Sequence, residues 1–284
     1  MNLKNHFGLD VGTSSLKLVQ LSSDGNTVKL ETLAQTPAAS EINLTQINTD
    51  LSPISDSIKN LVKLSHVTTK SVCISLPESQ IYTRIINMPV MSDVELNQAI
   101  KFQIEQYVPL PADEMTEKHS VISRPEIGKA NQNKAEMEVL LVATPNFLVE
   151  RYVQMMEKSG LEVVAIDTEI LASSRALVGA NVHSPTTLLV NMGSKGTDFA
   201  VVKHGDLLST RSIGTGGMAI ARAVASELNL DIVQAEEYKK NYGLDSSQLS
   251  GSVVKAVSPM MDLVVTEIKR ILGNVETSHP EDPV

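Results

Sequence analysis

The segment Phe7–Lys17, FGLDVGTSSLK, gathers polar side chains at the end of an apolar run. They comprise one acid, one glycine, three hydroxyl residues and one base: Asp10, Gly12, Thr13, Ser14, Ser15 and Lys17. A glycine lets the backbone approach a ligand closely, and hydroxyl and ammonium groups donate hydrogen bonds to phosphate oxygens. Because Asp10 would repel a phosphate, its presence requires a cation, for which hydrated Mg²⁺ is suited. Taken alone, the segment is better explained as a polar β-turn with a solvated lysine, because short motifs often match by chance.

A second segment repeats the pattern. Leu188–Gly193, LLVNMG, matches Phe7–Gly12, FGLDVG: an apolar strand, then Asn or Asp, one apolar residue and a glycine. An internal duplication suggests two similar domains that face one another, with each turn offering backbone N–H groups to an anion between them. The second turn is followed by GTGG at 214–217 and a helical pattern. This order favours a shared polyphosphate site over two unrelated turns.

Size and composition exclude several classes of protein. The chain has 284 residues, 42% hydrophobic and 20% charged, as expected of a globular protein with two domains or with one large domain that carries an insertion. Its formal charge of −9 and the lack of clustered Lys and Arg argue against nucleic-acid binding. Cys73, the single cysteine, is expected to be a reduced core thiol, which suits a cytoplasmic protein. The sequence suggests neither a signal peptide nor an apolar stretch near the roughly 20 residues that span a membrane.

The order of elements predicts an α/β domain that carries an insertion. Residues 6–33 read as strands turning at SSDGN, 52–65 as a helix and 71–77 as a buried strand. Within 79–160 we expect an α+β insertion, with a helix at 92–107 capped by Ser92 and Glu95. Strands should surround a loop at 126–134, and Thr144 should cap the helix that Gly160 ends. The apolar stripe of the 92–107 helix suits a core, or alternatively an interface.

The second half should contain three strands and three helices. Two glycine turns divide 186–213 into strands, and helices follow at 218–228 and after a cap at Asp231. A last helix should open at Ser258-Pro259 and end at Gly273. We therefore expect a first domain of residues 1–78 and 161–183, an inserted subdomain of 79–160, a second domain of 184–273 and a disordered tail of 274–284.

These segments resemble a known family. GLDVGTSSLKLVQL, the second hairpin and RSIGTGG look like the phosphate-binding elements of the actin/sugar-kinase/Hsp70 fold, which is ribonuclease H-like. YTRIINMPVMSDVELNQAIKFQIEQYVPLPADE resembles the inserted subdomain of the PilM family of actin-like type IV pilus assembly proteins. GLEVVAIDTEILASSRAL and SIGTGGMAIARAVASELNLDIVQAEEYKKNYG also match that family, so that the similarity covers most of residues 6–272. The related cell-division ATPase FtsA carries a different insertion.

The resemblance implies a nucleotide site for ATP and Mg²⁺, with Asp10 towards the metal. Its first hairpin comprises the residues named above, Asp10 to Lys17, and its second comprises Asn191, Gly193, Ser194 and Thr197. Gly216 and Gly217 would approach the nucleotide, and Glu236 and Lys239 would lie towards the ribose and adenine. Glu236 and Lys239 are three residues apart on a predicted helix, so a solvated ion pair explains them equally well. No catalytic residue is assigned.

The resemblance also implies a function and a partner. A cytoplasmic scaffold would dock the cytoplasmic tail of the inner-membrane protein PilN, in a groove between the inserted subdomain and the first domain, and would support pilus assembly and twitching motility. Membrane contact would come only through this partner, and the oligomeric state is left open. One alternative is a small-molecule kinase with Asp167 or Glu169 as general base, although both suit a polar helix start. Another is an FtsA-like division filament, against which the acidic tail argues.

Two features depart from the family pattern. Asn191 stands where the second hairpin normally has Asp, which removes a charge that would hold hydrated Mg²⁺ and should impair hydrolysis more than binding. After Gly273 we find no glycine-rich turn that could close over adenine, which suggests a truncated C-terminal part or an open pocket. We therefore expect weak ATP binding with little turnover.

Overall fold

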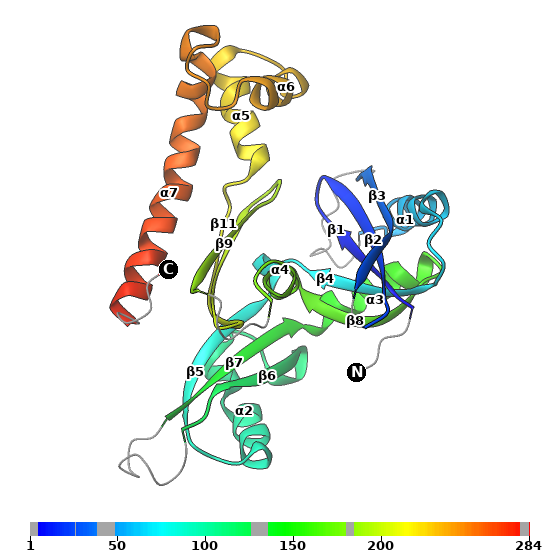
Figure 1. Ribbon diagram of the computed structural model, residues 1–284, viewed down its shortest axis with the longest axis vertical. Coiled ribbons are helices and arrows are strands. Elements are labelled where there is room, and N and C mark those ends of the chain that lie inside the picture. Colours follow the sequence, from blue (N-terminus) through cyan, green and yellow to red (C-terminus); the bar gives the residue numbers. More distant parts are fainter. Residues whose placement is uncertain (1–4, 26, 39–48, 126–135, 180–184, 279–283) are drawn as a thin grey trace. The chain divides into compact units, whose positions relative to one another are not determined.

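A computed structural model describes residues 5–25, 27–38, 49–125, 136–179, 185–278 and 284. The chain divides into two compact units, Met1–Ser173 and Ser174–Val284. Figure 1 shows their helices and strands. The expected loop at 126–134 lies outside the described residues.

The first unit is built on a five-stranded sheet with the order β3-β2-β1-β4-β8. Its strands are β1 (Phe7–Val11), β2 (Ser15–Ser23), β3 (Val28–Pro37), β4 (Ser71–Leu76) and β8 (Glu162–Thr168). The first three strands pair antiparallel, whereas β4 pairs parallel with both β1 and β8. A parallel pair needs a crossover, and helix α1 (Ser52–Ser65) supplies it between β3 and β4, with the bounds that the sequence predicts.

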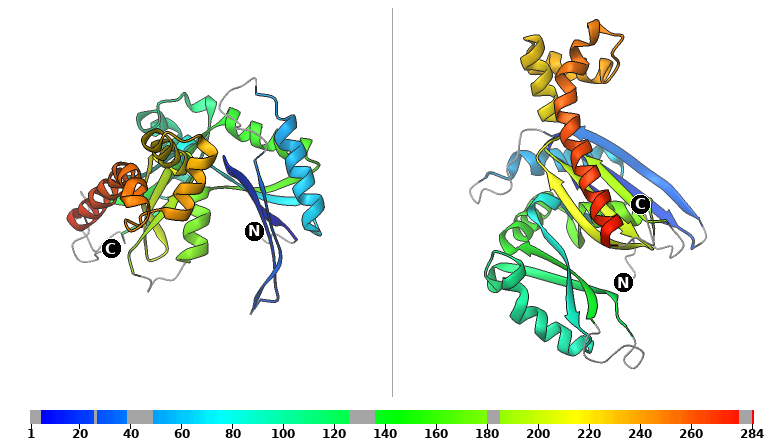
Figure 2. Two further views of the ribbon diagram at one scale, coloured as in Figure 1. Left: turned by 90° about the horizontal axis from the view of Figure 1, so that it is seen from above. Right: turned by 90° about the vertical axis from the view of Figure 1, so that its left-hand side faces the viewer.

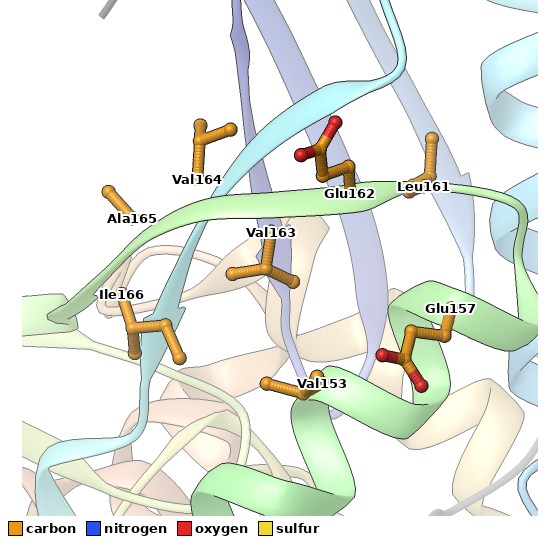
Figure 3. Close-up of a pocket in the computed structure, with 8 residues that line it drawn as sticks. All are labelled: Val153, Glu157, Leu161, Glu162, Val163, Val164, Ala165 and Ile166. Atoms are coloured by element: carbon orange, nitrogen blue, oxygen red, sulfur yellow. The ribbon is translucent and has the colours of Figure 1, made fainter.

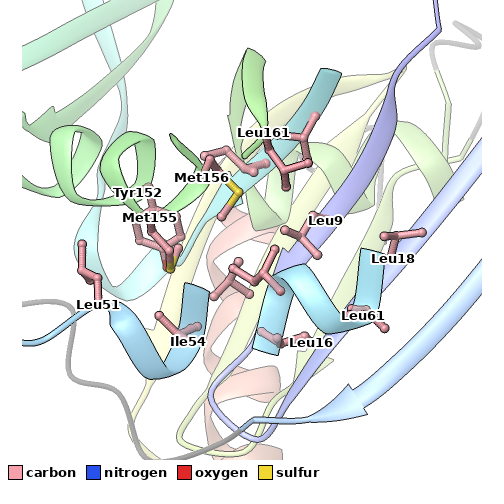
Figure 4. Close-up of a cluster of buried hydrophobic side chains, with 14 of the residues drawn as sticks. Leu9, Leu16, Leu18, Leu51, Ile54, Leu61, Tyr152, Met155, Met156 and Leu161 are labelled. Atoms are coloured by element: carbon pink, nitrogen blue, oxygen red, sulfur yellow. The ribbon is translucent and has the colours of Figure 1, made fainter. Parts of the chain in front are cut away.

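Helices α1 and α3 (Asn146–Lys158) cover one face of this sheet. Strands β1, β2 and β4 direct alternate apolar residues into the core. Figure 4 shows Leu16 and Leu18 of β2 in one cluster with Ile54 of α1 and Met155 of α3. All four side chains are almost fully buried, so this cluster fixes the strands whose ends carry the polar residues.

A second, three-stranded sheet with the order β5-β7-β6 follows within the first unit. It contains β5 (Tyr82–Pro89), β6 (Met115–Ser123) and β7 (Glu136–Pro145), with short 3-10 turns η1 (Glu78–Gln80) and η2 (Ala112–Glu114) beside them. Helix α2 (Asp93–Tyr107) packs Leu96, Ile100 and Ile104 against this sheet. The predicted capping box at Ser92 and Glu95 is present, and the apolar stripe of the helix is core.

Helix α3 begins differently from the prediction that Thr144 is its N-cap. Strand β7 continues to Pro145, and Thr144 is a buried strand residue opposite Thr116 of β6. Pro145 therefore takes the N-cap position without a side-chain hydrogen bond. At the other end Gly160 has a φ of +77°, as expected of a glycine that ends a helix.

The second unit contains a three-stranded sheet with the order β11-β10-β9 and three helices. Its elements are β9 (Thr187–Met192), β10 (Thr197–Lys203), β11 (Asp206–Ile213), α5 (Gly217–Leu228), α6 (Ile232–Tyr242), the 3-10 turn η3 (Leu249–Gly251) and α7 (Ser252–Ser278). Helix α4 (Glu169–Leu177) precedes them, directly after β8. Asp231 caps α6 by accepting hydrogen bonds from the amides of Val233 and Gln234, as predicted.

Helix α7 corrects two predictions: it starts before Ser258-Pro259 and runs past Gly273, so that 274–278 are helical. Pro259 and Gly273 have low helix propensity, but burial of apolar side chains outweighs this cost. Val253 and Val257 are buried before the proline, and Ile271 and Val275 are buried on either side of the glycine. The helix runs from α5 and α6 to the sheet of β9, β10 and β11 (Figures 1 and 2).

The prediction that no stretch is long and apolar enough to span a membrane is wrong, because one helical span meets the requirements of length and composition. The helical span Leu249–Thr277 has 29 residues and a mean hydropathy of 1.2 in its most apolar window. Buried residues of α7 belong to two hydrophobic clusters of the second unit. Only 22% of the most apolar window is buried in the second unit.

Candidate functional site

The first predicted phosphate turn connects β1 and β2. Asp10 lies directly opposite Lys17 in the strand register, and their charged groups are 2.7 Å apart. Both side chains remain accessible, at 37% and 51% exposure. A Cβ atom at Gly12 would lie 2.8 Å from the carbonyl oxygen of Ser15, so that only glycine fits this turn. The turn thus presents an accessible acid and base side by side.

The hydroxyl residues of this turn fall into two groups. Thr13 and Ser14 are exposed, whereas Ser15 begins β2 and is only 8% exposed. An ammonium group with two exposed hydroxyls suits an anion, and phosphate oxygens would compete with the carboxylate of Asp10 for Lys17.

Tyr152 of α3 is a residue near this turn that the sequence analysis missed. Burial raises the pKa of the Tyr152 hydroxyl well above its ordinary value, and the negative charges of Glu169 and Asp10 raise this pKa further. Both carboxylates therefore act on one buried hydroxyl of the first unit. Glu169 opens α4 directly after β8, which agrees with its expected place at a helix start.

The second predicted turn, Gly193–Gly196, joins β9 to β10 and is bound to the loop that enters α5. The amide of Gly217 donates to the carbonyl of Gly193 at 2.9 Å, and that of Met218 donates to the carbonyl of Ser194 at 2.8 Å. A Cβ atom at Gly216 would lie 2.6–2.7 Å from backbone atoms of the turn. Turn and loop therefore form one tightly packed backbone structure.

Thr197 has a different position from the other residues of the second hairpin. It is fully buried, and its hydroxyl donates to the carbonyl of Thr215 at 2.6 Å. The sequence analysis expects it in the nucleotide site, but its hydroxyl is engaged within the protein. The structure therefore favours a role for Thr197 in holding the loop against the hairpin.

Glu236 and Lys239 form an ion pair on α6, and the pair also contacts the glycine loop. The ammonium group of Lys239 lies 2.6 Å from the carboxylate of Glu236 and donates to the carbonyl of Gly217 at 3.0 Å. The Lys239 side chain is 19% exposed. Burial acts to raise the pKa of Glu236, but the hydrogen bonds and charges of Lys239 and Lys240 lower it below its ordinary value. The pair is thus part of the loop structure and not a freely solvated pair.

Asn191 has an acidic neighbour that the sequence analysis missed. Asn191 of β9 lies opposite Asp198 of β10, so that both side chains lie on one face of the sheet. Burial raises the pKa of Asp198, partly offset by the hydrogen bond that the Ser212 hydroxyl donates to it. The alternation of side chains along two strands joined by a short turn could have identified this pair from sequence.

Each turn, taken by itself, has features that suit phosphate groups better than a metal on its own. Glycines bring backbone atoms close together at both turns, and the first turn supplies an accessible ammonium group. Within the described residues, no group of three or more His, Cys, Asp and Glu side chains could hold a metal ion. Mg²⁺ would therefore depend on phosphate oxygens and water, with Asp10 as the accessible carboxylate of the first turn.

Comparison with known proteins identifies the family of this chain. Residues 8–284 match the family described as "Type IV pilus assembly protein PilM". The chain belongs to this family. The PilM family was also the one suggested by the sequence of the inserted segment.

Solved structures show the same fold. The chain is similar to a structure named "PilM-PilN type IV pilus biogenesis complex", with a TM-score of 0.79 and 22% identity over 97% of this chain and 78% of that one. It is also similar to the ethanolamine utilization protein EutJ from Carboxydothermus hydrogenoformans, with a TM-score of 0.56 and 16% identity over 94% and 71% of the two chains. The fold is the actin-like ATPase fold with an α/β architecture.

A curated relative is the cell division protein FtsA of Bacillus subtilis (strain 168). The two sequences are 27% identical over 110 residues, which are 39% of this chain and 25% of that protein. The chain thus matches about a quarter of the length of this relative, and the similarity does not extend to the whole of FtsA.

Proposed function

We propose that the chain is an assembly protein of the type IV pilus machinery that docks the cytoplasmic tail of a PilN-like inner-membrane protein. It would act on the cytoplasmic side of the inner membrane, held there by its partner, and would support twitching motility. The observation that carries this proposal is the match of residues 8–284 to the PilM family. The solved relative with a TM-score of 0.79 has PilN in the name of its complex, which supports the choice of partner.

The docking site would lie where the inserted subdomain of 79–160 joins the first domain of 1–78 and 161–183. Helix α3 makes this connection within the first unit. The side-chain amide of Asn146, the first residue of α3, donates a hydrogen bond to the carbonyl of Asp113 in the turn η2, next to the inserted sheet. The side-chain oxygen of Asn146 accepts a hydrogen bond from the hydroxyl of Thr116 in β6, within that sheet. Its buried residues Tyr152 and Met155 pack in the core of the five-stranded sheet. A ligand that touches α3 would thus contact an element anchored in both parts.

We also propose that the two turns bind ATP, with the second domain of 184–273 supplying the second turn. Lys17 would contact phosphate oxygens, and backbone amides of the two turns would add further donors. Gly216, Gly217 and the Glu236–Lys239 pair would lie beside the nucleoside. Mg²⁺, when bound, would neutralise phosphate charge, and Asp10 would orient it through water. Because Asn191 is neutral, we expect weak metal binding and little turnover.

Titration of ATP in a calorimeter, with and without Mg²⁺, tests the nucleotide proposal. We expect weak binding that Lys17→Met weakens about tenfold further, because a charge-assisted contact to phosphate is lost. Lys63→Met, on an exposed part of α1, is a matched control with the same change of charge. Equal ATP affinity of Lys17→Met and Lys63→Met would refute the assignment. ATP hydrolysis at rates typical of kinases would contradict the expected lack of turnover.

Binding of a synthetic peptide tests the docking proposal. The peptide covers the cytoplasmic N-terminal tail of the PilN-like protein from the same organism, and fluorescence anisotropy measures its affinity for the full chain. We expect saturable binding, and a scrambled peptide of equal composition is the control. If both peptides bind equally weakly, the docking function is wrong.

A further inference from the structure

Strand β9 ends the sheet of the second unit with an edge that lacks the usual protection. The strand order is β11-β10-β9, and none of the described strands pairs with the outer edge of β9. Its sequence, TLLVNM, contains no charged residue and no proline, and its pairing with β10 has no bulge. Natural proteins use charges, prolines and bulges to keep such edges from pairing with another chain. The edge of β9 is therefore open to a further strand.

The other strands at the ends of the described sheets differ from β9. Each of β3, β5, β6, β8 and β11 carries at least one charged residue. Strand β3 also has a bulge at Glu31, whose carboxylate is paired with Lys29. Strand β8 borders an open groove of about 510 Å³ beside α3 that is lined in part by Glu157 and Glu162 (Figure 3). This groove lies in the part of the first unit already proposed for docking, whereas β9 has no function so far.

Two aliphatic side chains of β9 lie on the face of the sheet that α7 covers. Leu188 is opposite Val201 of β10, and Val190 is opposite Phe199. Val201 and Phe199 are buried in one cluster with residues of α7. Directly opposite residues of an antiparallel pair share a face, so Leu188 and Val190 point to the side of the helix. Val190 is nevertheless 44% exposed at the open edge.

One flank of α7 is apolar and only partly covered. With 3.6 residues per turn, five apolar residues fall on a single flank beside the buried stripe of the helix: Val254, Met261, Val265, Ile268 and Leu272. The other flank contains Glu267, which accepts a hydrogen bond from Arg211 of β11 at 2.9 Å. Because β11 and β9 are at opposite ends of the sheet, the apolar flank lies on the side of β9. None of its five residues is fully buried, and Val265 is 41% exposed.

The open edge and the apolar flank together form one surface for an added chain. The C-terminal half of α7 lies over the sheet (Figure 2). A strand added to β9 would make main-chain hydrogen bonds to its edge, and apolar groups above that strand would cover the flank. A contiguous exposed apolar surface of this kind marks an interaction site.

Charges beside the apolar flank indicate a second copy of this chain as the occupant. Asp262 and Lys269 border the flank on its solvent side and are exposed. Neither is in an ion pair with another described residue. If two α7 helices run antiparallel with Val265 of each against Ile268 of the other, Asp262 of each lies within one turn of Lys269 of the other. The surface is thus complementary to itself, as a two-fold interface requires.

We propose that the chain forms a two-fold dimer through β9 and α7. The two β9 strands pair antiparallel and join the two three-stranded sheets into one, and the two α7 helices run antiparallel over the joint. Leu188 of each copy lies opposite Val190 of the partner subunit, beneath the two apolar flanks. The dimer involves the second unit alone and is independent of the proposed docking function.

Analytical ultracentrifugation of the full chain tests the dimer. We expect the wild type to form a dimer in a concentration-dependent manner. Val265→Glu should raise the dissociation constant of the dimer about thirtyfold or more, because it buries an unpaired carboxylate in each copy. Leu263→Glu is the matched control on the same helix. Leu263 is 51% exposed on the flank of Glu267, so that this variant should form the dimer like the wild type.

A reversal of charge tests the antiparallel arrangement of the helices. Asp262→Lys should raise the dissociation constant about three- to tenfold, because it places a second ammonium group beside Lys269 of the partner subunit. The double variant Asp262→Lys with Lys269→Asp should restore the affinity of the wild type, since the pairs form again with their charges exchanged. Hydrogen exchange adds a readout of position: amides of β9 should exchange more slowly as the protein concentration rises, and those of β11 should not change.

Each result supports or overturns the dimer. Loss of the dimer in Val265→Glu, with Leu263→Glu unaffected and the double charge variant restored, supports it. A wild type that is monomeric at every soluble concentration overturns it, and so does a dimer that Val265→Glu leaves intact. If the monomer instead binds vesicles of phosphatidylglycerol and Val265→Glu abolishes this binding, lipid covers the flank and the dimer is wrong. Should Val265→Glu fail to fold, the charge variants and the exchange of β9 still decide.

Discussion

Replacing Gly216 by alanine should destabilise the second unit, although a single methyl group is added. The φ angle of Gly216 is −141°, which any residue can adopt, so that backbone strain is not the cause. The added Cβ would lie 2.6 Å from the amide nitrogen of Gly196 and 2.7 Å from the carbonyl oxygens of Gly193 and Ser194. These are backbone atoms and cannot rotate away, as the end of a side chain could.

The size of the effect follows from two contributions. Overpacking of this kind costs about 1–3 kcal/mol. The turn and the loop would also separate, which weakens the two hydrogen bonds donated by the amides of Gly217 and Met218, at about 0.5–1 kcal/mol each. We therefore expect the free energy of opening this region to fall by about 2–5 kcal/mol.

Gly214→Ala is the matched control, because it makes the same substitution two residues earlier and a Cβ there meets nothing within 4 Å. Hydrogen exchange of the Gly217 and Met218 amides measures the effect locally. We expect exchange about 30-fold faster or more in Gly216→Ala, since each 1.36 kcal/mol is a factor of ten, and unchanged exchange in Gly214→Ala. Equal protection in the two variants would refute the close packing of turn and loop.

Three further substitutions have expected outcomes. Asn191→Asp should lower the free energy of unfolding of the second unit by about 0.5–1 kcal/mol in EDTA, because it places a second carboxylate opposite Asp198. If the two carboxylates face bound Mg²⁺, added Mg²⁺ and ATP should restore this stability in thermal unfolding. Ile100→Ala should cost about 2–4 kcal/mol in urea unfolding because Ile100 is 1% exposed, while Phe102→Ala should be nearly neutral. Ser92→Ala should cost about 1 kcal/mol and speed exchange in the first turn of α2, as the capping box is lost.

Much of the fold could be predicted because local signals agreed with the packing. Helix α1 has the bounds that its proline start and apolar spacing predict, and α2 begins at the capping box of Ser92. The duplicated glycine hairpins also form as expected, since the register of β1 with β2 and that of β9 with β10 bring the predicted polar residues to the turns.

The remaining features depend on contacts that a local pattern does not contain. The bounds of α7 are set by burial against two clusters, which overrides the signals of Pro259 and Gly273. Thr197 could not be assigned a buried bond to Thr215, because the two residues are 18 positions apart and meet only when the loop packs on the hairpin. The β-bulge of β8 at Val164 is visible only in the pairing of this strand with β4.

Helix α7 also has a consequence for how the second unit melts. Its N-terminal half completes the cluster of α5 and α6 through Val253 and Val257, and its C-terminal half completes the cluster of the sheet through Ile271 and Val275. Unfolding of α7 would therefore expose buried residues of both clusters. Because one continuous helix contributes to two small cores, we expect these cores to unfold as a single cooperative element.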